Sequence, residues 1–511
     1  MKKAFSGLKS IFLVLILFLF STSAYTQSND VLEALKQNAF NNPADIEAWL
    51  DLGNAYLDGS NFDLAADSFQ EAVALDYRSG EAHFGLGLAE YGRGDFPAAL
   101  FEFSEVTRLF PDRFDGHFNR AVTLAKLLQF DEAVAAFNAA IQEAEPEATE
   151  EKVIEAQMGL AGQLKRLEDY GAAAAAYAAA LELSPDNSDI IFLRADALYR
   201  SGQGLDALAD LRELEGISND YKVSTLIADI YLQQEQTDYA LRSLERALSR
   251  IGTSDPRAQA SILVKLGVLQ RDLGQEAESA ASFQQAVAAD RNLWQAHYYL
   301  GLSYLESEQR PGALAEFEQA RNLNPENKEI YLALASTYEQ LGQFPQAIEA
   351  AQAYLSRLDE GQEAEAAPLE ALIGRASYRL GDYMGALEHF DTALSFNPGD
   401  ASSQLWAGLA ALQNQNYAEA VSFLEQAVQL DNESVEAKAN LGVAYFQEER
   451  FSDAAFVYQL MLDENEDDAE AMFNLGLSFY AQSAFEEARE IWEKAASLGY
   501  SAAIDALAQY F

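Results

Sequence analysis

The sequence predicts an all-α protein built as an array of antiparallel helix pairs, and three observations lead to this expectation. Small and bulky apolar residues recur in a frame of about 34 residues along most of the 511-residue chain. Only 11 prolines and many Ala, Leu, Glu and Gln residues favour helices throughout. Hydrophobic residues make up 49% of the chain, which is too many for a mainly disordered protein, and the chain is too long for one compact core.

The first 24 residues are predicted to be a secretory signal peptide. Lys2, Lys3 and Lys9 precede an unbroken apolar run at 11–20, and small residues follow up to Ala24, after which we expect cleavage. The apolar run is half as long as the roughly 20 residues that a membrane span needs. We therefore expect export to the periplasm or beyond, with no transmembrane span in the mature chain.

The mature chain is expected to have three parts. Residues 25–45 are predicted to form a linker and an N-terminal capping helix, and residues 46–500 the repeat array. Residues 501–511 are predicted to form a C-terminal capping helix, because the end repeats of a solenoid expose hydrophobic faces that need cover.

The repeat is defined first by a small residue, which we place at position 8 of a frame that begins at Ile46. Position 8 is Gly or Ala in thirteen copies: Gly53, Gly87, Ala121, Ala161, Ala195, Ala228, Gly267, Gly301, Ala335, Gly374, Gly408, Gly442 and Gly476. Eight of the twelve steps between them are 34 residues, and the others are 40, 33, 39 and 39. So regular a spacing predicts one helix pair per copy.

Two further positions complete the pattern. Position 20 is Ala in twelve copies and Ser279 in the other. Position 24 is bulky in every copy but one: Phe69, Phe103, Phe137, Tyr177, Leu211, Leu244, Phe283, Phe317, Ala351, Phe390, Leu424, Tyr458 and Trp492. Positions 20 and 24 are four residues apart and so share one helical face. The small residues let two helices approach, and the bulky residue fills the space between one pair and the next.

Turn residues separate the predicted helices. Polar or breaking residues at 58–61 and 92–95 lie inside pairs, and Pro111, Pro185 and Pro325 end helices between pairs. Insertions fall at 143–151, 252–257 and 359–367, and the first and third are expected to be acidic loops.

This frame resembles the tetratricopeptide repeat (TPR) family, whose pattern carries W-x-x-L-G-x-x-Y followed by A, F, A and a late P. The first copy here reads Trp49-x-x-Leu52-Gly53-x-x-Tyr56, followed by Ala65, Phe69 and Ala72. The resemblance covers about 31–500 of the sequence. It implies a right-handed superhelical solenoid of about thirteen helix pairs that binds a protein or an extended peptide in its concave groove.

The resemblance also implies that positions 2, 5, 9 and 12 of each first helix line this groove. The expected binding residues include aromatic side chains at positions 5 and 12, namely Phe84, Phe118, Phe192, Tyr91, Tyr199 and Tyr298. They also include five cations on the same helices, Lys165, Arg166, Arg200, Arg375 and Arg379, which would attract an acidic partner. The alternative is that the position 5 side chains pack between adjacent repeats. The Lys and Asn pairing of family members that clamp C-terminal carboxylates is absent, because positions 5 and 9 read Leu50/Asn54 and Phe84/Leu88.

Composition argues against several other classes of function. A formal net charge of -47 repels nucleic acid, and a chain with 0 Cys has no thiol nucleophile or thiolate metal site. Three of the 4 histidines, His83, His117 and His297, occupy position 4 and are expected to be packing residues, while His389 has no assigned role. The acidic run at 463–468 lacks the glycine and the ligand spacing of a calcium loop.

The sequence therefore predicts a non-catalytic scaffold of the cell envelope, with no metal and no cofactor. No phosphate loop, nucleophile elbow or metalloprotease motif is present in the sequence. The alternative is a scaffold for cell-wall or exopolysaccharide assembly, in which the aromatic residues of the groove stack on sugar rings.

Overall fold

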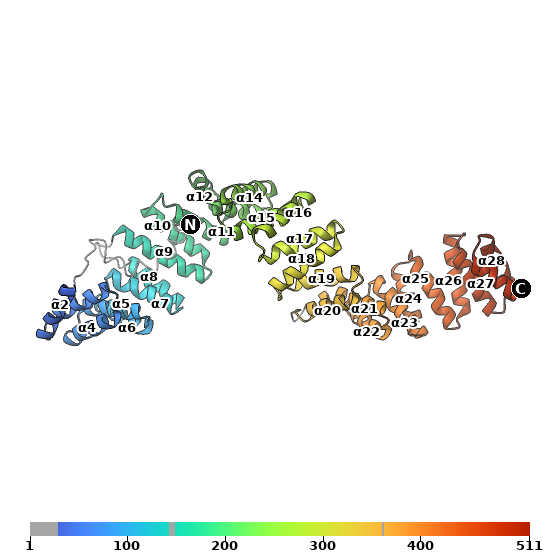
Figure 1. Cartoon of the computed structure of the whole chain (residues 1–511), viewed down its shortest axis with the longest axis horizontal. Coiled ribbons are helices and arrows are strands. Elements are labelled where there is room, and N and C mark those ends of the chain that lie inside the picture. Colours follow the sequence, from blue (N-terminus) through green and yellow to red (C-terminus); the bar gives the residue numbers. More distant parts are fainter. Residues whose placement is uncertain (1–28, 143–148, 360–361) are drawn as a thin grey trace. The chain divides into compact units, whose positions relative to one another are not determined.

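The computed structural model describes residues 29–142, 149–359 and 362–511, and the predicted signal peptide lies outside them. Within these residues the chain forms twenty-eight α-helices and one short 3-10 helix, with no strand (Figure 1). The helices fall into two compact units, one ending at Ile251 and the other beginning at Gly252.

The first unit consists of helix α2 (Asn29–Asn41) followed by six antiparallel pairs. The first helices of these pairs are α3 (Ile46–Asp58), α5 (Gly80–Arg93), α7 (Phe114–Lys126), α9 (Glu150–Arg166), α11 (Ser188–Arg200) and α13 (Tyr221–Gln233). The second helices are α4 (Phe62–Leu75), α6 (Phe96–Leu109), α8 (Phe130–Gln142), α10 (Tyr170–Leu183), α12 (Gly204–Ile217) and α14 (Thr237–Ile251).

The second unit contains seven pairs and ends in helix α29 (Ser501–Tyr510). Its first helices are α15 (Pro256–Asp272), α17 (Trp294–Glu306), α19 (Lys328–Gln340), α21 (Ala367–Leu380), α23 (Ala401–Gln413), α25 (Val435–Gln447) and α27 (Ala469–Ala481). Its second helices are α16 (Glu276–Ala289), α18 (Arg310–Leu323), α20 (Phe344–Leu355), α22 (Tyr383–Phe396), α24 (Tyr417–Leu430), α26 (Phe451–Glu464) and α28 (Phe485–Ser497). Six and seven pairs together confirm the expected array of thirteen.

The helices of each unit pack in chain order. Each first helix packs on its own second helix, and that second helix packs on the first helix of the next pair. First helices of neighbouring pairs also contact one another, as α3 does with α5 and α15 with α17. Where these contacts occur the first helices lie side by side, and we call the set of first helices in a unit its layer of first helices.

The small residue at position 8 and the bulky residue at position 24 fit together as the sequence predicts. A Cβ atom on Gly53 would lie 2.7 Å from the ring of Phe69, and one on Gly85 of the next pair would lie 2.4 Å from the same ring. Phe69 is only 1% exposed and therefore fills the space between two adjacent pairs. The same close approach of position 8 to position 24 recurs at Gly301 and Phe317, where the distance is 2.6 Å.

The turn inside each pair contains one residue in the left-handed backbone region, always at position 15. It is Gly in five pairs and another residue in eight: Ser60, Leu128, Glu168, Glu235, Glu308, Gln415, Glu449 and Ser483. Glycine adopts a positive φ without steric cost, whereas a side chain with Cβ does not. The turn geometry is thus common to all pairs, although the sequence at this position is not.

In the described part of the third insertion, a short helix stands where the sequence predicts an acidic loop. This is the 3-10 helix η1 (Glu363–Ala366), which precedes α21 directly. The ammonium group of Lys328 on α19 donates hydrogen bonds to Gln362 (3.0 Å) and Glu365 (2.9 Å), so the preceding repeat anchors this segment.

Candidate partner-binding face

The predicted binding residues of the first unit lie on the layer of first helices, and the aromatic ones at position 5 are partly buried. The ring of Phe84 on α5 lies 5.8 Å from Phe103, and the guanidinium of Arg113 lies over it at 4.9 Å. Phe118 on α7 stacks on Phe114 at 5.6 Å and meets the edge of Phe137 at 5.8 Å. Each ring therefore packs on the buried residue at position 24 of its own pair and is covered in part by a second neighbour, Arg113 or Phe114, which leaves it half-buried.

The other aromatic residues of the prediction are also partly exposed. Phe192 and Tyr199 lie on α11, and Tyr298 on α17 lies 5.9 Å from the ring of Phe317. Tyr91 packs edge-on against Phe96 at 5.2 Å. Burial raises the pKa of Tyr91 to about 12, and its hydroxyl is a buried group with no hydrogen-bond partner in the described part of the chain. These side chains thus pack against neighbouring residues and also remain partly exposed. The two roles considered for position 5, lining the groove and packing between repeats, are therefore compatible.

The predicted cations of the first unit already have partners within the protein. Lys165 and Arg200 bind the carboxylate of Asp196 at 2.7 and 2.9 Å. Burial works to raise the pKa of Asp196, but these two hydrogen bonds outweigh it and hold the pKa below its usual value. Arg166 lies over the ring of Phe130 at 5.3 Å, and Arg200 over that of Tyr170 at 5.7 Å. These cations therefore join neighbouring repeats, a role that the sequence reasoning did not assign to them.

The two cations of the second unit are placed in the same way. Arg375 on α21 binds both carboxylate oxygens of Glu339 on α19, at 2.8 and 3.1 Å. Arg379 lies 5.2 Å above the ring of Trp406 on α23. Arg375 is thus neutralised by a carboxylate and Arg379 lies against an aromatic ring, so little of their positive charge remains available to an acidic partner.

An unusual carboxyl group lies on α9 among the first helices. Burial raises the pKa of Glu155 to about 7, and the charge of Glu151 one turn earlier adds to the effect. Close by in sequence, Lys152 is bound to Asp115 of α7 at 2.9 Å. Glu155 therefore changes its charge near neutral pH on the predicted binding face.

The last three pairs present a different surface. We call the side chains at positions 5, 9 and 12 of α23, α25 and α27 the C-terminal strip: Leu405, Leu409, Leu412, Ala439, Val443, Phe446, Phe473, Leu477 and Tyr480. None of them is charged, and each remains at least partly exposed. Val443 is 37% exposed and lies at the centre of the strip. At α27 the rings of Phe473 and Tyr480 pack against Tyr500 and Tyr510 near the end of the chain. The strip is thus an uncharged, partly exposed surface that is most accessible at Val443 on α25.

Hydrogen bonds at position 4 were not predicted. The Nε2 atom of His83 binds the carbonyl oxygen of Tyr77 in the preceding turn at 2.9 Å, and its Nδ1 atom binds Glu102 at position 23 at 2.6 Å. His297 makes the equivalent contacts with Arg291 and Glu316. Trp49, His117 and Tyr331 also bind the carbonyl six residues earlier.

His389, to which the sequence assigns no role, forms a hydrogen-bonded pair of the same kind. It lies at position 23 and binds Glu370 at position 4 at 2.7 Å, so the two residue types have exchanged places. The recurring separation of 19 residues between His and Glu is the signal that sequence reasoning could have used. These histidines stabilise helix pairs, and the interpretation of position 4 as a packing position holds.

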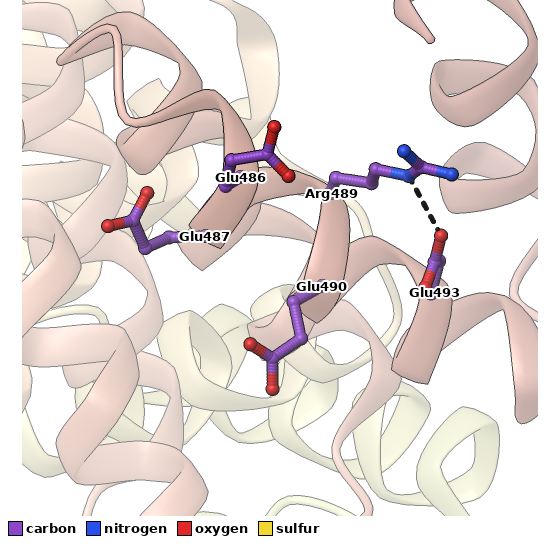
Figure 2. Close-up of a pocket in the computed structure, with 5 residues that line it drawn as sticks. All are labelled: Glu486, Glu487, Arg489, Glu490 and Glu493. Carbon is purple, nitrogen blue, oxygen red and sulfur yellow. Dashed lines mark hydrogen bonds and ion pairs between the residues drawn. The ribbon is translucent and has the colours of Figure 1, made fainter.

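The outer surface of α28 carries a shallow hollow of about 480 Å³. It is lined by Glu486, Glu487, Arg489, Glu490 and Glu493, all from this one helix (Figure 2). Arg489 is bound to Glu493 at 2.9 Å, and Glu487 and Glu490 point away from this pair (Figure 2). The hollow brings together no nucleophile, base and oxyanion donor, so it offers no catalytic arrangement.

The described part of the chain contains neither a candidate metal site nor a candidate membrane span. Across 29–142, 149–359 and 362–511, no three or more His, Asp and Glu residues are grouped so that they could hold a metal ion. None of the helices in these ranges combines the length and the apolar character of a membrane span.

Matches to known protein families extend over nearly the whole array of helix pairs. Models described as tetratricopeptide repeat match residues 50–148, 160–221, 225–293, 298–364 and 372–498. The chain belongs to the tetratricopeptide repeat family. TPR arrays typically bind protein or peptide partners and are typically non-catalytic, which supports a protein-interaction scaffold.

Individual TPR relatives are distant. Human DnaJ homolog subfamily C member 3 is 28% identical over 198 residues, which is 36% of this chain and 39% of that protein. The chicken protein of the same name is 26% identical over 220 residues, 40% of this chain and 42% of that protein. This TPR chain therefore matches only about two fifths of the length of these relatives.

Solved TPR structures are similar at low identity. The crystal structure of YrrB, described as a TPR protein with an unusual peptide-binding site, is 19% identical, covers 38% of this chain and 95% of its own, and has a TM-score of 0.35. The Cut9-Hcn1 hetero-tetramer of APC/C covers 94% of this chain and 99% of its own at 15% identity and a TM-score of 0.34.

Proposed function

We propose that this TPR protein is an exported, non-catalytic scaffold that binds protein or peptide partners of the cell envelope on its layer of first helices. The observation that carries the proposal is the row of partly exposed aromatic side chains, represented by Phe84, Phe118 and Phe192. These rings are half-buried and lie on first helices, and apolar side chains gathered on one face of a soluble protein often mark an interaction site. Aromatic residues are also enriched at the centres of protein interfaces.

The proposed location rests on the N-terminal sequence alone. A basic start, a ten-residue apolar run and small residues up to Ala24 favour export by a secretory signal. N-terminal sequencing of the protein recovered from the envelope fraction of its host tests this part. A mature chain that begins at Tyr25 supports it, and a chain that retains Lys2 and Lys3 contradicts it.

A crosslinking pull-down from the native envelope tests the binding face. The variant Phe84→Ala/Phe118→Ala/Phe192→Ala is compared with wild type and with Phe101→Ala/Tyr239→Ala. The control removes aromatic side chains that are 57% and 55% exposed on second helices. Specific partners that vanish only in the first variant, while circular dichroism remains helical, support the proposal. An unchanged set of partners in the first variant would refute it.

The glycan alternative gives a different outcome in a parallel experiment. Aromatic rings bind sugars by stacking, and Phe84 and Phe118 are half-buried aromatic residues on the first helices. Retention of the wild-type protein on neutral glycans of an array, and its loss in the triple variant, would replace the peptide partner with a polysaccharide.

A further inference from the structure

We infer that the C-terminal strip binds the apolar face of a basic amphipathic helix, an inference that rests on the proposed function and names the chemistry of one partner. The dimensions of the strip agree with such a ligand. Positions 5 to 12 span seven residues of helix, about 10 Å at 1.5 Å per residue, which equals the width of a helix. A row of three helices, each about 10 Å across with its side chains, gives a strip of roughly 30 Å at most, enough for about 14–18 helical residues.

The charges around the strip select the sign of the partner. Between residues 400 and 500 the chain has nineteen Asp and Glu residues and four Lys and Arg residues. Glu436 and Glu470 are exposed at position 2 of α25 and α27, on the face that carries the strip. An apolar surface within so negative a field attracts cationic partners and repels acidic ones.

The four cations of this region do not offset that field where a partner would bind. Lys438 is bound to Glu464 at 2.6 Å and Arg450 to Asp453 at 2.7 Å. Arg489 is bound to Glu493 at 2.9 Å, and Lys494 to Glu490 at the same distance. Each positive charge is therefore matched by a neighbouring carboxylate, and the remaining carboxylates give the region its negative potential.

The same charges argue against the other occupants of an apolar strip. A second copy of this chain would bring its own net charge of -47 toward the nineteen carboxylates. Nucleic acid and anionic lipid surfaces are repelled for the same reason. A basic helix with one apolar face complements the strip in both respects. Its apolar face would pack on the uncharged side chains and its basic residues would face the surrounding carboxylates, as amphipathic helices do when they bind in grooves.

Fluorescence anisotropy with synthetic peptides tests this inference on the full-length protein. The probe is an 18-residue peptide of Lys and Leu patterned as an amphipathic helix. The comparison peptides are a scrambled peptide of the same composition and a Glu and Leu peptide of the same pattern. We expect the patterned Lys and Leu peptide to bind at least tenfold more tightly than either comparison peptide, and less tightly at high salt.

Two variants with the same change of charge locate the site. Val443→Lys places a cation at the centre of the strip, whereas Phe456→Lys places one on α26 at a side chain that is 65% exposed. We expect at least a tenfold loss of affinity for Val443→Lys and less than threefold for Phe456→Lys. A photocrosslinking residue at position 443, but not at position 456, is expected to capture the peptide, which checks the site without a change of charge.

Several outcomes would overturn the inference. These are no binding of the patterned peptide, equal binding of the scrambled or acidic peptide, equal loss in both lysine variants, or capture from position 456 alone. Failure here together with loss of native partners in the Phe84→Ala/Phe118→Ala/Phe192→Ala variant would leave the proposed function in place with a different partner chemistry. Failure of both experiments would remove the proposed function as well.

Discussion

The contact between positions 8 and 24 predicts a coupled effect of two substitutions, Gly301→Ala and Phe317→Leu. A Cβ atom on Gly301 would lie 2.6 Å from Cε1 and 2.7 Å from Cδ1 of Phe317, about 1 Å closer than carbon atoms normally approach. Phe317 is fully buried, so its ring must move against packed neighbours. Elsewhere in the chain Ala at position 8 occurs with Leu at position 24, as in Ala195 and Leu211, and also with Phe, as in Ala121 and Phe137. The ring at position 24 can therefore shift to admit a methyl group, and the cost of Gly301→Ala depends on how far it must move.

The magnitudes follow from these distances. Overpacking costs about 1–3 kcal/mol, and replacing helical Gly by Ala returns about 1 kcal/mol, so Gly301→Ala alone is expected to destabilise by about 1 kcal/mol. Phe317→Leu alone is expected to cost about 1–2 kcal/mol, because it leaves a small cavity beside a glycine. In the double variant the added methyl group occupies part of this cavity. The loss is therefore expected to be smaller than the sum by about 1 kcal/mol or more.

Hydrogen exchange of α17 and α18 in the full-length protein measures this coupling, because repeat arrays open locally. A coupling of about 1 kcal/mol corresponds to about a fivefold difference in protection. Gly162→Ala is the control, since a Cβ there meets no atom within 4 Å and the substitution is expected only to stabilise α9. Effects that add to within about 0.3 kcal/mol would refute the proposed fit between the two positions.

Three other predictions follow from single residues. Burial works to lower the pKa of His83, but its hydrogen bonds to Glu102 and Tyr77 raise it overall. The contribution of protonated His83 to the free energy of unfolding is therefore full below pH 6.5 and is lost as the pH rises through the folded-state pKa. In urea unfolding, the free energy of unfolding should fall less between pH 6 and 9 in His83→Gln than in the wild type. The pKa of Glu155 is raised to about 7, so its ionised form destabilises the fold. Glu155→Gln should therefore raise the free energy of unfolding at pH 8 by about 1–2 kcal/mol. At pH 5, where Glu155 is protonated in the folded protein, the substitution should leave it nearly unchanged. Leu128 is 68% exposed with φ of 61°, so Leu128→Gly should stabilise α7 and α8 by about 0.5–1 kcal/mol in hydrogen exchange, and a loss of protection would contradict the assigned strain.

The fold could be predicted because its determinants are local and repeated. Gly53 and Phe69 are 16 residues apart in one helix pair, and thirteen copies of that relation leave little choice of architecture. The boundary between the two units was not predicted. It coincides with the insertion at 252–257, which the sequence marks only as extra residues in one repeat.

The candidate site could be predicted only in outline. The frame identifies which positions lie on the first helices, but the partners of each side chain come from neighbouring repeats and vary between them. Arg113 over Phe84 and Asp196 between Lys165 and Arg200 are examples, since neither contact follows from the repeat pattern. Whether a cation is available to a ligand therefore depends on residues that the pattern leaves unspecified.

The exchanged pair of Glu370 and His389 has a consequence for how such repeats tolerate change. In two other pairs His occupies position 4 and Glu position 23, with a contact of 2.6 Å in both, whereas here the order is reversed and the contact is 2.7 Å. A substitution at either position alone leaves one buried or half-buried polar group without its partner. The two arrangements, His at position 4 with Glu at position 23 and the reverse, are therefore separated by an unfavourable single substitution. We expect the residues at these two positions to change together, so that one of them predicts the other.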